Sequence, residues 1–568
     1  MKRTTIFIII LILFISICGF SFIELSVGNS VCSGVTPHHL LARDVIDNFF
    51  KYTSKHSNPD TIIIFSPDHF NKGNLFEDKF ITVESKEFSG VKINKVLLNE
   101  LARDNPIAPS DTAVFWDHGI MNLLPFVKKY FPHSTVVPFL IPQAIDYPAL
   151  NKFTESLNSL ASKKAIVIAS VDFSHYLPKT ISDFHDIKSI RTLINFDKSN
   201  FNKIEVDSWQ ALYIARYFAR MRRMEHPFII AHKNANDYVK DKTLYSTTSY
   251  FSVAFGRGKP EKLLSDTQTM LFTGDVMLGR GVGNLIQRNS PIYPFEKIKI
   301  ALRGIDYVIG NLEGPISKTA VKYPEGVLKF SFDEDVINGL LAAHFNILSL
   351  ANNHTFDSGE KGLNETRKIL KESGINSVGD PVKAEPKYCL KEKNIIFLGF
   401  NAINQFKEKE ILHTVKVVRK DNPDKFLIVI FHWGIEYQEK NSLMQEELAQ
   451  ETADNGADLI IGAHPHVVQN IEIYKPTNSN KEVPIFYSLG NFVFDQYFSK
   501  ETQQGLMVGV ELSKNKEVLR LFPIQSSLSQ PELMKPVNAT LFLNHLATIS
   551  DKKLTEEIKN GIITINRK

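Results

Sequence analysis

Short apolar runs alternate with amphipathic stretches along the first half of the chain. Runs at 61–67, 134–140 and 164–174 are almost continuously apolar and predict buried strands. Between 208 and 223 the apolar residues recur at the spacing of a helix that buries one face. A further run at 248–258 predicts a strand that closes this region. Strands that alternate with helices predict an α/β fold in which helices pack on a sheet.

A second series of the same kind follows the charged stretch KPEKLLSD at 259–266. Two amphipathic stretches, 359–374 and 442–456, predict helices between its strands. Seven apolar runs predict those strands: 269–278, 306–313, 345–353, 394–400, 426–434, 457–465 and 484–492. A chain of 568 residues is too long for one hydrophobic core, so we expect two α/β domains. Their predicted bounds are 30–257 and 268–525, with a linker at 258–267 and a helical tail at 526–568.

The N-terminus carries a long apolar run behind two cations. Lys2 and Arg3 precede residues 6–22, which are almost all apolar. This length is near the lower limit of a membrane span and exceeds the core of most signal peptides. The two cations favour a cytoplasmic N-terminus. We therefore expect residues 1–29 to be an uncleaved signal anchor rather than a cleaved signal. The chain would then be a single-pass protein of the cell membrane, with its bulk outside the cytoplasm.

Charge and cysteine content exclude several classes of partner and metal site. The formal net charge of +4 is small for this length and gives no basic patch, which argues against a nucleic-acid partner. The three cysteines are too few for a disulfide framework, and none has the spacing of a zinc site. Any bound metal must therefore use histidine, aspartate, glutamate or asparagine.

Five of the strands predicted in the second half end in residue types that bind metals. These residues are Asp275, Glu313, Asn353 with His354, His432, and His464 with His466. In open α/β sheets, functional groups gather at the carboxyl ends of the strands. A single histidine behind a strand is commonly a turn residue, but five such ends favour a two-metal hydrolytic centre. Paired cations there would activate a water molecule and stabilise charge on the substrate. Nitrogen and oxygen ligands without sulfur suit Mn, Fe or Zn.

The stretch LIIGAHPHVVQN at 459–470 places two imidazoles around a proline. In an extended segment, residues two apart point to the same side. Pro465 restricts the backbone between them. We expect His464 and His466 to serve one cation each.

The order GD…NLE…NNH…HWG…GAHPH…SLGNF resembles the CapA family of capsule and poly-γ-glutamate synthesis proteins, over about residues 268–525. That family is similar in turn to the calcineurin-like metallophosphatases. The resemblance implies a four-layer α/β sandwich and an exported, membrane-anchored protein. It implies that His354 is the catalytic residue, as general acid or transition-state stabiliser. It also implies six metal ligands: Asp275, Glu313 as the bridging carboxylate, Asn353, His432, His464 and His466.

The first motif departs from the metallophosphatase pattern. Those enzymes have D-x-H, whereas this chain has Asp275-Val276-Met277 and therefore lacks one imidazole. The resemblance then implies that the metal position beside Asp275 is the weaker of the two.

The first domain has its own histidines and carboxylates near predicted strand ends. They are His38 and His39, Asp68 and His69, Asp117 and His118, and Asp172 and His175. The segments TPHH, SPDHF, DHGIMNLLPF and ASVDFSHY resemble the Memo-like family, also called AmmeMemoRadiSam system protein B, over about residues 30–257. That family is similar to the class III extradiol dioxygenases.

The Memo-like resemblance implies a pocket for one Fe or another divalent ion. Its residues would be His38, His69, His175 and Asp207, the last where some members have cysteine. Three other histidines, His39, His118 and His185, are equally well explained as surface or supporting residues. A pocket that binds without catalysis is as well supported as an enzyme.

Three functions remain open. The first, which we favour, is synthesis, export or trimming of an anionic surface polymer or its precursor, either capsule or poly-γ-glutamate. A metal-dependent hydrolase or transferase would act there, with polymer-synthase membrane proteins as partners. The second is a non-catalytic scaffold of a polymer-synthase complex. The third is an iron-dependent oxidoreductase that acts through the Memo-like domain.

Overall fold

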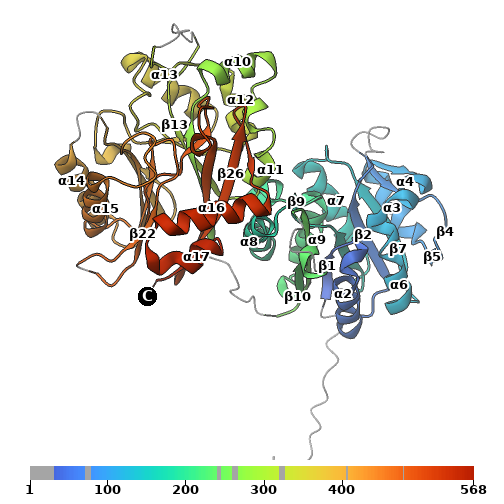
Figure 1. Ribbon diagram of the computed structural model, residues 1–568. Helices are drawn as coiled ribbons and strands as arrows, with labels where there is room; N and C mark the ends of the chain where they lie inside the picture. The colour runs from blue at the N-terminus through green and yellow to red at the C-terminus, as the bar shows by residue number, and fades with distance from the viewer. Residues whose placement is uncertain are drawn as a thin grey trace, which may run out of the picture. The chain divides into compact units, whose positions relative to one another are not determined.

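The computed structural model describes residues 31–70, 79–239, 245–258, 267–318, 327–403, 407–477 and 479–567. The chain forms two compact units, each built on β-sheets covered by helices (Figure 1). The first unit comprises the described residues of Met1–Asp172, Gln210–Lys233 and Tyr250–Glu261. The second unit comprises those of Phe173–Trp209, Asn234–Ser249 and Lys262–Lys568. The predicted mixed α/β architecture of two domains is confirmed.

Four parallel strands form the centre of the first unit. In sheet order they are β1 (Val31–Thr36), β8 (Ile166–Ser170), β2 (Thr61–Pro67) and β7 (Thr135–Ile141). Nearly all of their residues are buried, as expected for parallel strands covered on both faces. The flanking strands are β11 (Thr247–Gly256) and β10 (His226–Asn234) beyond β1, and β3 (Phe80–Thr82) and β6 (Ile107–Pro109) beyond β7.

Helices cover both faces of this sheet (Figure 1). On one face lie α2 (Arg43–His56) and α6 (Leu124–Tyr130), whose Phe50 and Phe126 rings stack 5.8 Å apart. On the other lie α7 (Tyr147–Leu160) and α9 (Trp209–Met221). Ser33 on β1 donates a 2.7 Å hydrogen bond to a carbonyl of α9. This layering leaves the carboxyl edge of the parallel strands free to carry functional groups.

Two large sheets form the core of the second unit. The first sheet has the order β17 (Asn376–Val378), β16 (Ile347–Ser349), β13 (Tyr307–Leu312), β12 (Gln268–Val276), β25 (Gln504–Leu512), β26 (Lys516–Ser527) and β27 (Gln530–Leu533). The second has the order β18 (Leu390–Lys391), β19 (Ile395–Asn401), β20 (Phe426–His432), β21 (Leu459–Ala463), β23 (Val483–Phe486) and β22 (Ile471–Tyr474). Strands β12, β13, β16 and β17 are mutually parallel, and so are β19, β20, β21 and β23.

The two sheets share one apolar cluster, which includes Phe272 of β12 and Ile428 of β20. Helices cover their outer faces (Figure 1). On the first sheet these are α10 (Arg280–Arg288), α12 (Val336–Ala342) and α13 (Gly359–Glu372), and on the second α14 (Glu408–Asp421) and α15 (Leu443–Asp454). Side chains at the carboxyl ends of strands from both sheets can therefore meet.

Helix α8 (Lys179–Asn195) belongs to the second unit, although it lies within the predicted first domain. Its Ile181 and Phe184 join the apolar cluster on the outer face of the first sheet. Arg191 pairs with Asp306 through two nitrogens. His185 is fully buried, with its ring nitrogens 3.2 Å from the Ser174 hydroxyl and 3.1 Å from the Ala301 carbonyl. The role of His185, which the sequence left open, is therefore in packing.

The tail predicted as helical contains two strands as well. Helices α16 (Pro536–Ile549) and α17 (Thr555–Lys559) are present, but β27 precedes them. Strand β28 (Ile562–Asn566) follows them and pairs with β26. In β28 buried Ile563 and Ile565 flank an exposed threonine, which is the alternation of a strand with one covered face.

Single-pass membrane topology was predicted from the N-terminal apolar run. None of the helices in the described part of the chain combines the length and apolar character that a membrane crossing requires. This finding contradicts the predicted single-pass membrane protein. The predicted anchor itself, residues 1–29, lies outside the described residues, as does most of the predicted linker.

Candidate metal centre

Strands from both sheets of the second unit end at one site. Asp275 is the second-last residue of β12, and Glu313 directly follows β13. His432 is the last residue of β20, and His464 directly follows β21. Parallel strands bring their carboxyl ends to one edge, which explains why residues far apart in sequence converge.

Three buried side chains form the first group of possible ligands. Asp275, Glu313 and His432 offer ligand atoms that all lie within 4.8 Å of one another. Glu313 is fully buried, and no described residue donates a hydrogen bond to either of its carboxylate oxygens. Burial, and secondly the charge of Asp275, raise the pKa of Glu313 well above its ordinary value. Two carboxylates in a dry site repel each other when ionised, so a cation between them would be strongly stabilising.

Side-chain amides hold this group in place. Asn311 donates to Asp275 Oδ1 at 2.8 Å and lies 3.1 Å from His432 Nδ1. Asn352 donates in turn to Asn311 Oδ1 at 3.1 Å. His432 Nε2 lies 2.8 Å from Asn353 Oδ1, a separation at which both atoms can bind one cation at about 2.1 Å. The predicted amide ligand thus lies next to the first group.

The second group lies on two loops. Glu436, His464 and His466 offer ligand atoms within 4.8 Å of one another. His464 Nδ1 is buried without a hydrogen-bond partner among the described residues, and burial, then His466, lower the pKa of His464 to about 4. A neutral imidazole with an unpaired nitrogen is the form that binds metals. His466 Nε2 lies 4.0 Å from Glu313 Oε1, so Glu313 faces both groups.

The segment that carries the two histidines is not extended, so the predicted reason for their common orientation is wrong. The φ angles of His464 and His466 are +98° and +59°, in the left-handed region that strains residues other than glycine. The amide of Tyr437 donates to the carbonyl of Pro465 at 2.8 Å. This bond ties the loop of Glu436 to the histidine loop, so tertiary contacts hold the strained backbone in place.

His354 lies beside the two groups and is oriented by its own partners. Its Nδ1 is 2.8 Å from Asp357 Oδ2, and the Phe330 ring stacks on the imidazole with centroids 3.9 Å apart. The amide of Phe330 also donates to Asp357 Oδ2, at 2.7 Å. With Nδ1 engaged, Nε2 is the nitrogen that can exchange a proton with a substrate.

Met277, the residue that replaces an imidazole in the first motif, is part of the packing. It is fully buried within the apolar cluster on the outer face of the first sheet. Its sulfur accepts a 3.2 Å hydrogen bond from the amide of Gly279.

Sequence reasoning missed three residues of this site. Asn311 lies inside a strand, Glu436 lies in a loop, and Asp357 is three residues beyond His354. For Asp357 the i, i+3 spacing from a histidine was a usable signal. Glu436 had none, because only the fold brings its loop to the histidines.

The first unit brings three histidines together at its own strand ends. His38 follows β1, His69 follows β2, and His118 begins α5 (His118–Met121); their ligand atoms lie within 4.8 Å of one another. His69 Nδ1 is 2.9 Å from Asp117 Oδ2, and His38 Nε2 is 3.4 Å from Asp172 Oδ2. His118 is thus part of the cluster, which the sequence left open.

Two further residues were predicted for that pocket. His175, at the start of β9 (His175–Leu177), and Asp207 belong to the second unit. The first unit by itself therefore offers three imidazoles, one of them different from the predicted set.

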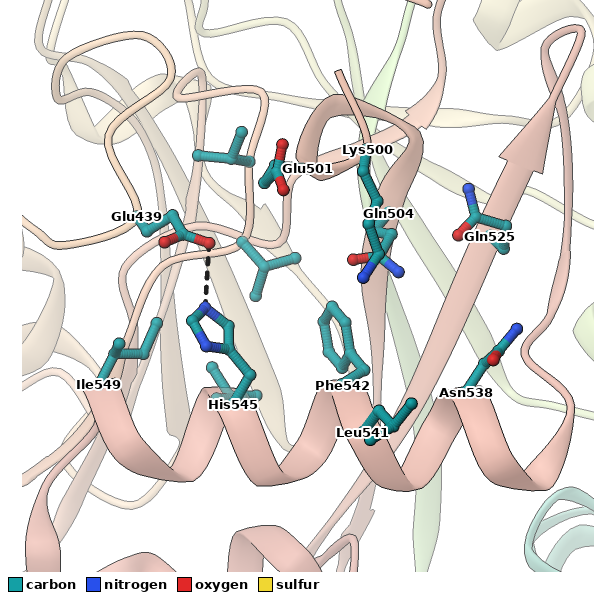
Figure 2. A pocket seen from close by; sticks show the side chains of 13 residues that line it. Glu439, Lys500, Glu501, Gln504, Gln525, Asn538, Leu541, Phe542, His545 and Ile549 are labelled. Carbon is teal, nitrogen blue, oxygen red and sulfur yellow. Dashed lines mark hydrogen bonds and ion pairs between the residues drawn. The ribbon is translucent and has the colours of Figure 1, made fainter.

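A separate pocket of about 410 Å³ lies in the second unit along α16 (Figure 2). Leu541, Phe542 and His545 of this helix line it, and His545 pairs with Glu439 at 3.0 Å. Its lining includes none of the predicted metal ligands. The shape of a pocket alone therefore does not identify the place where the possible metal ligands gather.

Comparison with protein families matches the two units separately. Residues 269–496 match the family described as bacterial capsule synthesis protein PGA_cap. Residues 33–221 match the family described as Memo-like protein.

Curated relatives match the same two regions. A "Capsule biosynthesis protein CapA" of Bacillus anthracis is 31% identical over 325 residues, 52% of this chain and 74% of the relative. A "PGA biosynthesis protein CapA" of Bacillus subtilis is 31% identical over 270 residues, 44% of this chain and 69% of the relative. A "MEMO1 family protein" of Sulfurisphaera tokodaii is 25% identical over 244 residues, 39% of this chain and 82% of the relative.

Proposed function

We propose that this chain, which belongs to the CapA family of bacterial capsule synthesis proteins, acts in the synthesis or trimming of an anionic surface polymer. It carries a Memo-like domain ahead of the CapA domain. Two relatives are named for capsule and for PGA biosynthesis, which supports capsule or poly-γ-glutamate as the polymer class. The reaction would be metal-dependent hydrolysis or transfer, in a sandwich of two sheets like that of the metallophosphatases.

One observation carries the metal-dependent part of this proposal. Glu313 is fully buried beside Asp275 and His432, and no described residue donates a hydrogen bond to its carboxylate. Such a carboxylate fits a divalent cation. The residues that would hold one or two ions are Asp275, Glu313, Asn353 and His432, together with Glu436, His464 and His466. Oxygen and nitrogen donors of this kind suit Mn, Fe or Zn. Bound ions would lower the pKa of a water molecule and stabilise charge on the substrate.

The protein's own residues would orient the reactants and move the proton. His354 donates a proton from Nε2 to the leaving group, as a general acid. Asp357 accepts from Nδ1–H and so fixes the tautomer, while Phe330 fixes the plane of the ring. Asn311 and Asn352 hold Asp275 at the strand end.

Metal content and polymer cleavage of the full chain test the proposal together. The chain is stripped with a chelator, reloaded with Mn²⁺, Fe²⁺ or Zn²⁺, and assayed on poly-γ-glutamate and on a phosphodiester. We expect cleavage of one substrate that depends on the added metal. A chain that binds metal but cleaves neither substrate would favour a scaffold in a polymer-synthase complex. A chain that binds no metal would overturn the proposal.

We propose further that the first unit binds one divalent ion through His38, His69 and His118. Support comes from their ligand atoms, which lie within 4.8 Å of one another. The test is anaerobic loading with Fe²⁺, followed by iron analysis and oxygen consumption. The matched control for His118→Asn is His39→Asn, because His39 is engaged with the Tyr250 hydroxyl at 3.1 Å. Equal iron content in both variants would argue against this site.

A further inference from the structure

Arg280 begins helix α10 beside the proposed metal centre. Its guanidinium carbon lies 4.7 Å from the centroid of the Phe330 ring and 5.6 Å from that of Phe494. Phe330 stacks on His354, and the Phe494 ring lies 4.7 Å from that of His466. The guanidinium therefore lies against the two aromatic rings that contact imidazoles of the site.

Asp495 holds this guanidinium but leaves most of its donors available. Nε lies 3.2 Å from Asp495 Oδ2, and one terminal nitrogen pairs with Oδ1. A guanidinium has five N–H groups, so three of them are not used by Asp495. The Arg280 side chain is 32% exposed, whereas that of Asp495 is only 12% exposed. The Arg280 side chain is thus partly accessible to a ligand.

The backbone at Arg280 is strained. Its φ is +48°, in the left-handed region, and the next amide, of Gly281, donates to Asp495 Oδ2 at 2.9 Å. Non-glycine residues in this region cost about 1–3 kcal/mol and concentrate at functional sites. The strained backbone therefore marks Arg280 as a candidate functional residue.

The guanidinium of Arg280 is a positive charge beside several carboxylates. The carboxylates of Asp275, Glu313 and Glu436 repel an anionic polymer to the extent that bound cations leave their charge uncompensated. Planar guanidinium groups bind carboxylates and phosphates through two parallel hydrogen bonds, which lysine cannot do.

We propose that Arg280 binds an oxyanion of the substrate, a carboxylate or a phosphate, next to the group that reacts. This inference rests on the proposed function, because it takes the metal centre as the place of reaction. Arg280 would then select anionic polymers over neutral ones, and its role would be binding rather than proton transfer.

Binding of defined polymers to the full chain tests this assignment. Wild type, Arg280→Ala and Arg280→Lys are titrated with poly-γ-glutamate, with polyphosphate and with neutral dextran. Arg288→Ala is the matched control, because Arg288 is an exposed arginine at the other end of the same helix. We expect Arg280→Ala to weaken binding of one anionic polymer by roughly tenfold to a hundredfold, the value of a charge-assisted hydrogen-bond pair. Arg280→Lys should weaken it several-fold, and Arg288→Ala should have no effect.

The outcomes separate this inference from the proposed reaction. Weaker binding of poly-γ-glutamate alone identifies a carboxylate, and weaker binding of polyphosphate alone identifies a phosphate. Metal content should stay at the wild-type level in every variant. Arg280-dependent binding without cleavage would refute hydrolysis and leave the arginine's role intact. Wild-type affinity for both polymers in Arg280→Lys and Arg280→Ala would overturn the role of Arg280. If wild type binds neither polymer, both proposals fail.

Discussion

The carboxylates at the two strand-end sites differ in how they are satisfied. In the first unit, Asp117 accepts hydrogen bonds from the Ser66 hydroxyl at 3.1 Å, from the Gly119 amide at 2.9 Å and from His69 at 2.9 Å. In the second unit, Glu313 is equally buried and accepts none from the described residues. Both sites collect imidazoles, but Asp117 has three hydrogen-bond donors among the described residues, whereas Glu313 has none.

This difference in hydrogen bonding accompanies opposite pKa shifts of the two carboxylates. Burial works against the ionised form of Asp117, but the hydrogen bond and charge of His69 outweigh it and lower the pKa of Asp117. Burial and the neighbouring Asp275 raise the pKa of Glu313. The first site therefore keeps its negative charge with protein partners alone, whereas the second becomes stable in its ionised form only when a cation binds. Two clusters with similar residue types can thus differ in how strongly they require a metal.

The largest expected effect is that of Glu313→Gln. In the metal-free protein, the raised pKa means that the folded state keeps a proton that the unfolded state loses. Stability therefore falls as pH rises above 4.5, the ordinary pKa of the group. The glutamine amide carries no charge and can donate to Asp275. We expect this variant to lose metal from the second unit, to lose the pH slope, and to gain roughly 1–3 kcal/mol when metal-free. Metal analysis and thermal unfolding between pH 4 and 8 measure these effects.

A matched control is Glu517→Gln, since Glu517 is also fully buried but pairs with Arg567. This control should retain its metal and lose stability. Metal retained in Glu313→Gln would remove the contrast between the two sites.

The second expected effect is on catalysis by a histidine–carboxylate pair. Both units have one: His354 Nδ1 is 2.8 Å from Asp357, and His69 Nδ1 is 2.9 Å from Asp117. We expect His354→Asn to lower kcat on the cleaved polymer about 10²–10⁴-fold, the usual contribution of a general acid, with metal retained. His69→Asn should leave polymer cleavage unchanged. Steady-state kinetics of both variants measure these effects. An equal loss of kcat in the two variants would mean that the two sites act on one reaction.

The third expected effect has the opposite sign to the first. Because the pKa of Asp117 is lowered on folding, its ionised form contributes stability above pH 3.8, its ordinary pKa. That contribution is lost as pH falls through the lower pKa of the folded state. We expect Asp117→Asn to cost about 1–3 kcal/mol in metal-free protein at pH 7. Chemical unfolding of the metal-free chain checks this, and a stabilised Asp117→Asn would contradict our account of the first site.

Most of the α/β layering could be predicted from the sequence, because buried parallel strands are apolar throughout and helices show one apolar face. The residues at strand ends could be predicted for the same reason, since Asp275, Glu313 and His432 each follow an apolar run. Helix α8 could not be assigned to its unit, because its buried surface surrounds the whole helix and carries no directional pattern.

The rest of the candidate site depends on loops and on backbone strain. Glu436 joins the histidines only because its loop is bonded to Pro465. The left-handed backbone of His464 and His466 has no sequence signature, since non-glycine residues adopt it only where tertiary contacts hold them. His118 shows the same limit, because its neighbours come from two other strand ends.

The smallest expected effect tests whether sulfur has any part in the second site. Met277 follows Asp275 by two residues, yet it is fully buried among apolar side chains, and its sulfur accepts from the Gly279 amide. Leucine has nearly the same volume, so Met277→Leu should cost less than about 1.5 kcal/mol and leave metal content unchanged. Thermal unfolding and metal analysis of the full chain give both values. Loss of metal in this variant would show that the thioether is a ligand. The second site would then differ from the first in ligand chemistry as well as in its unsatisfied carboxylate.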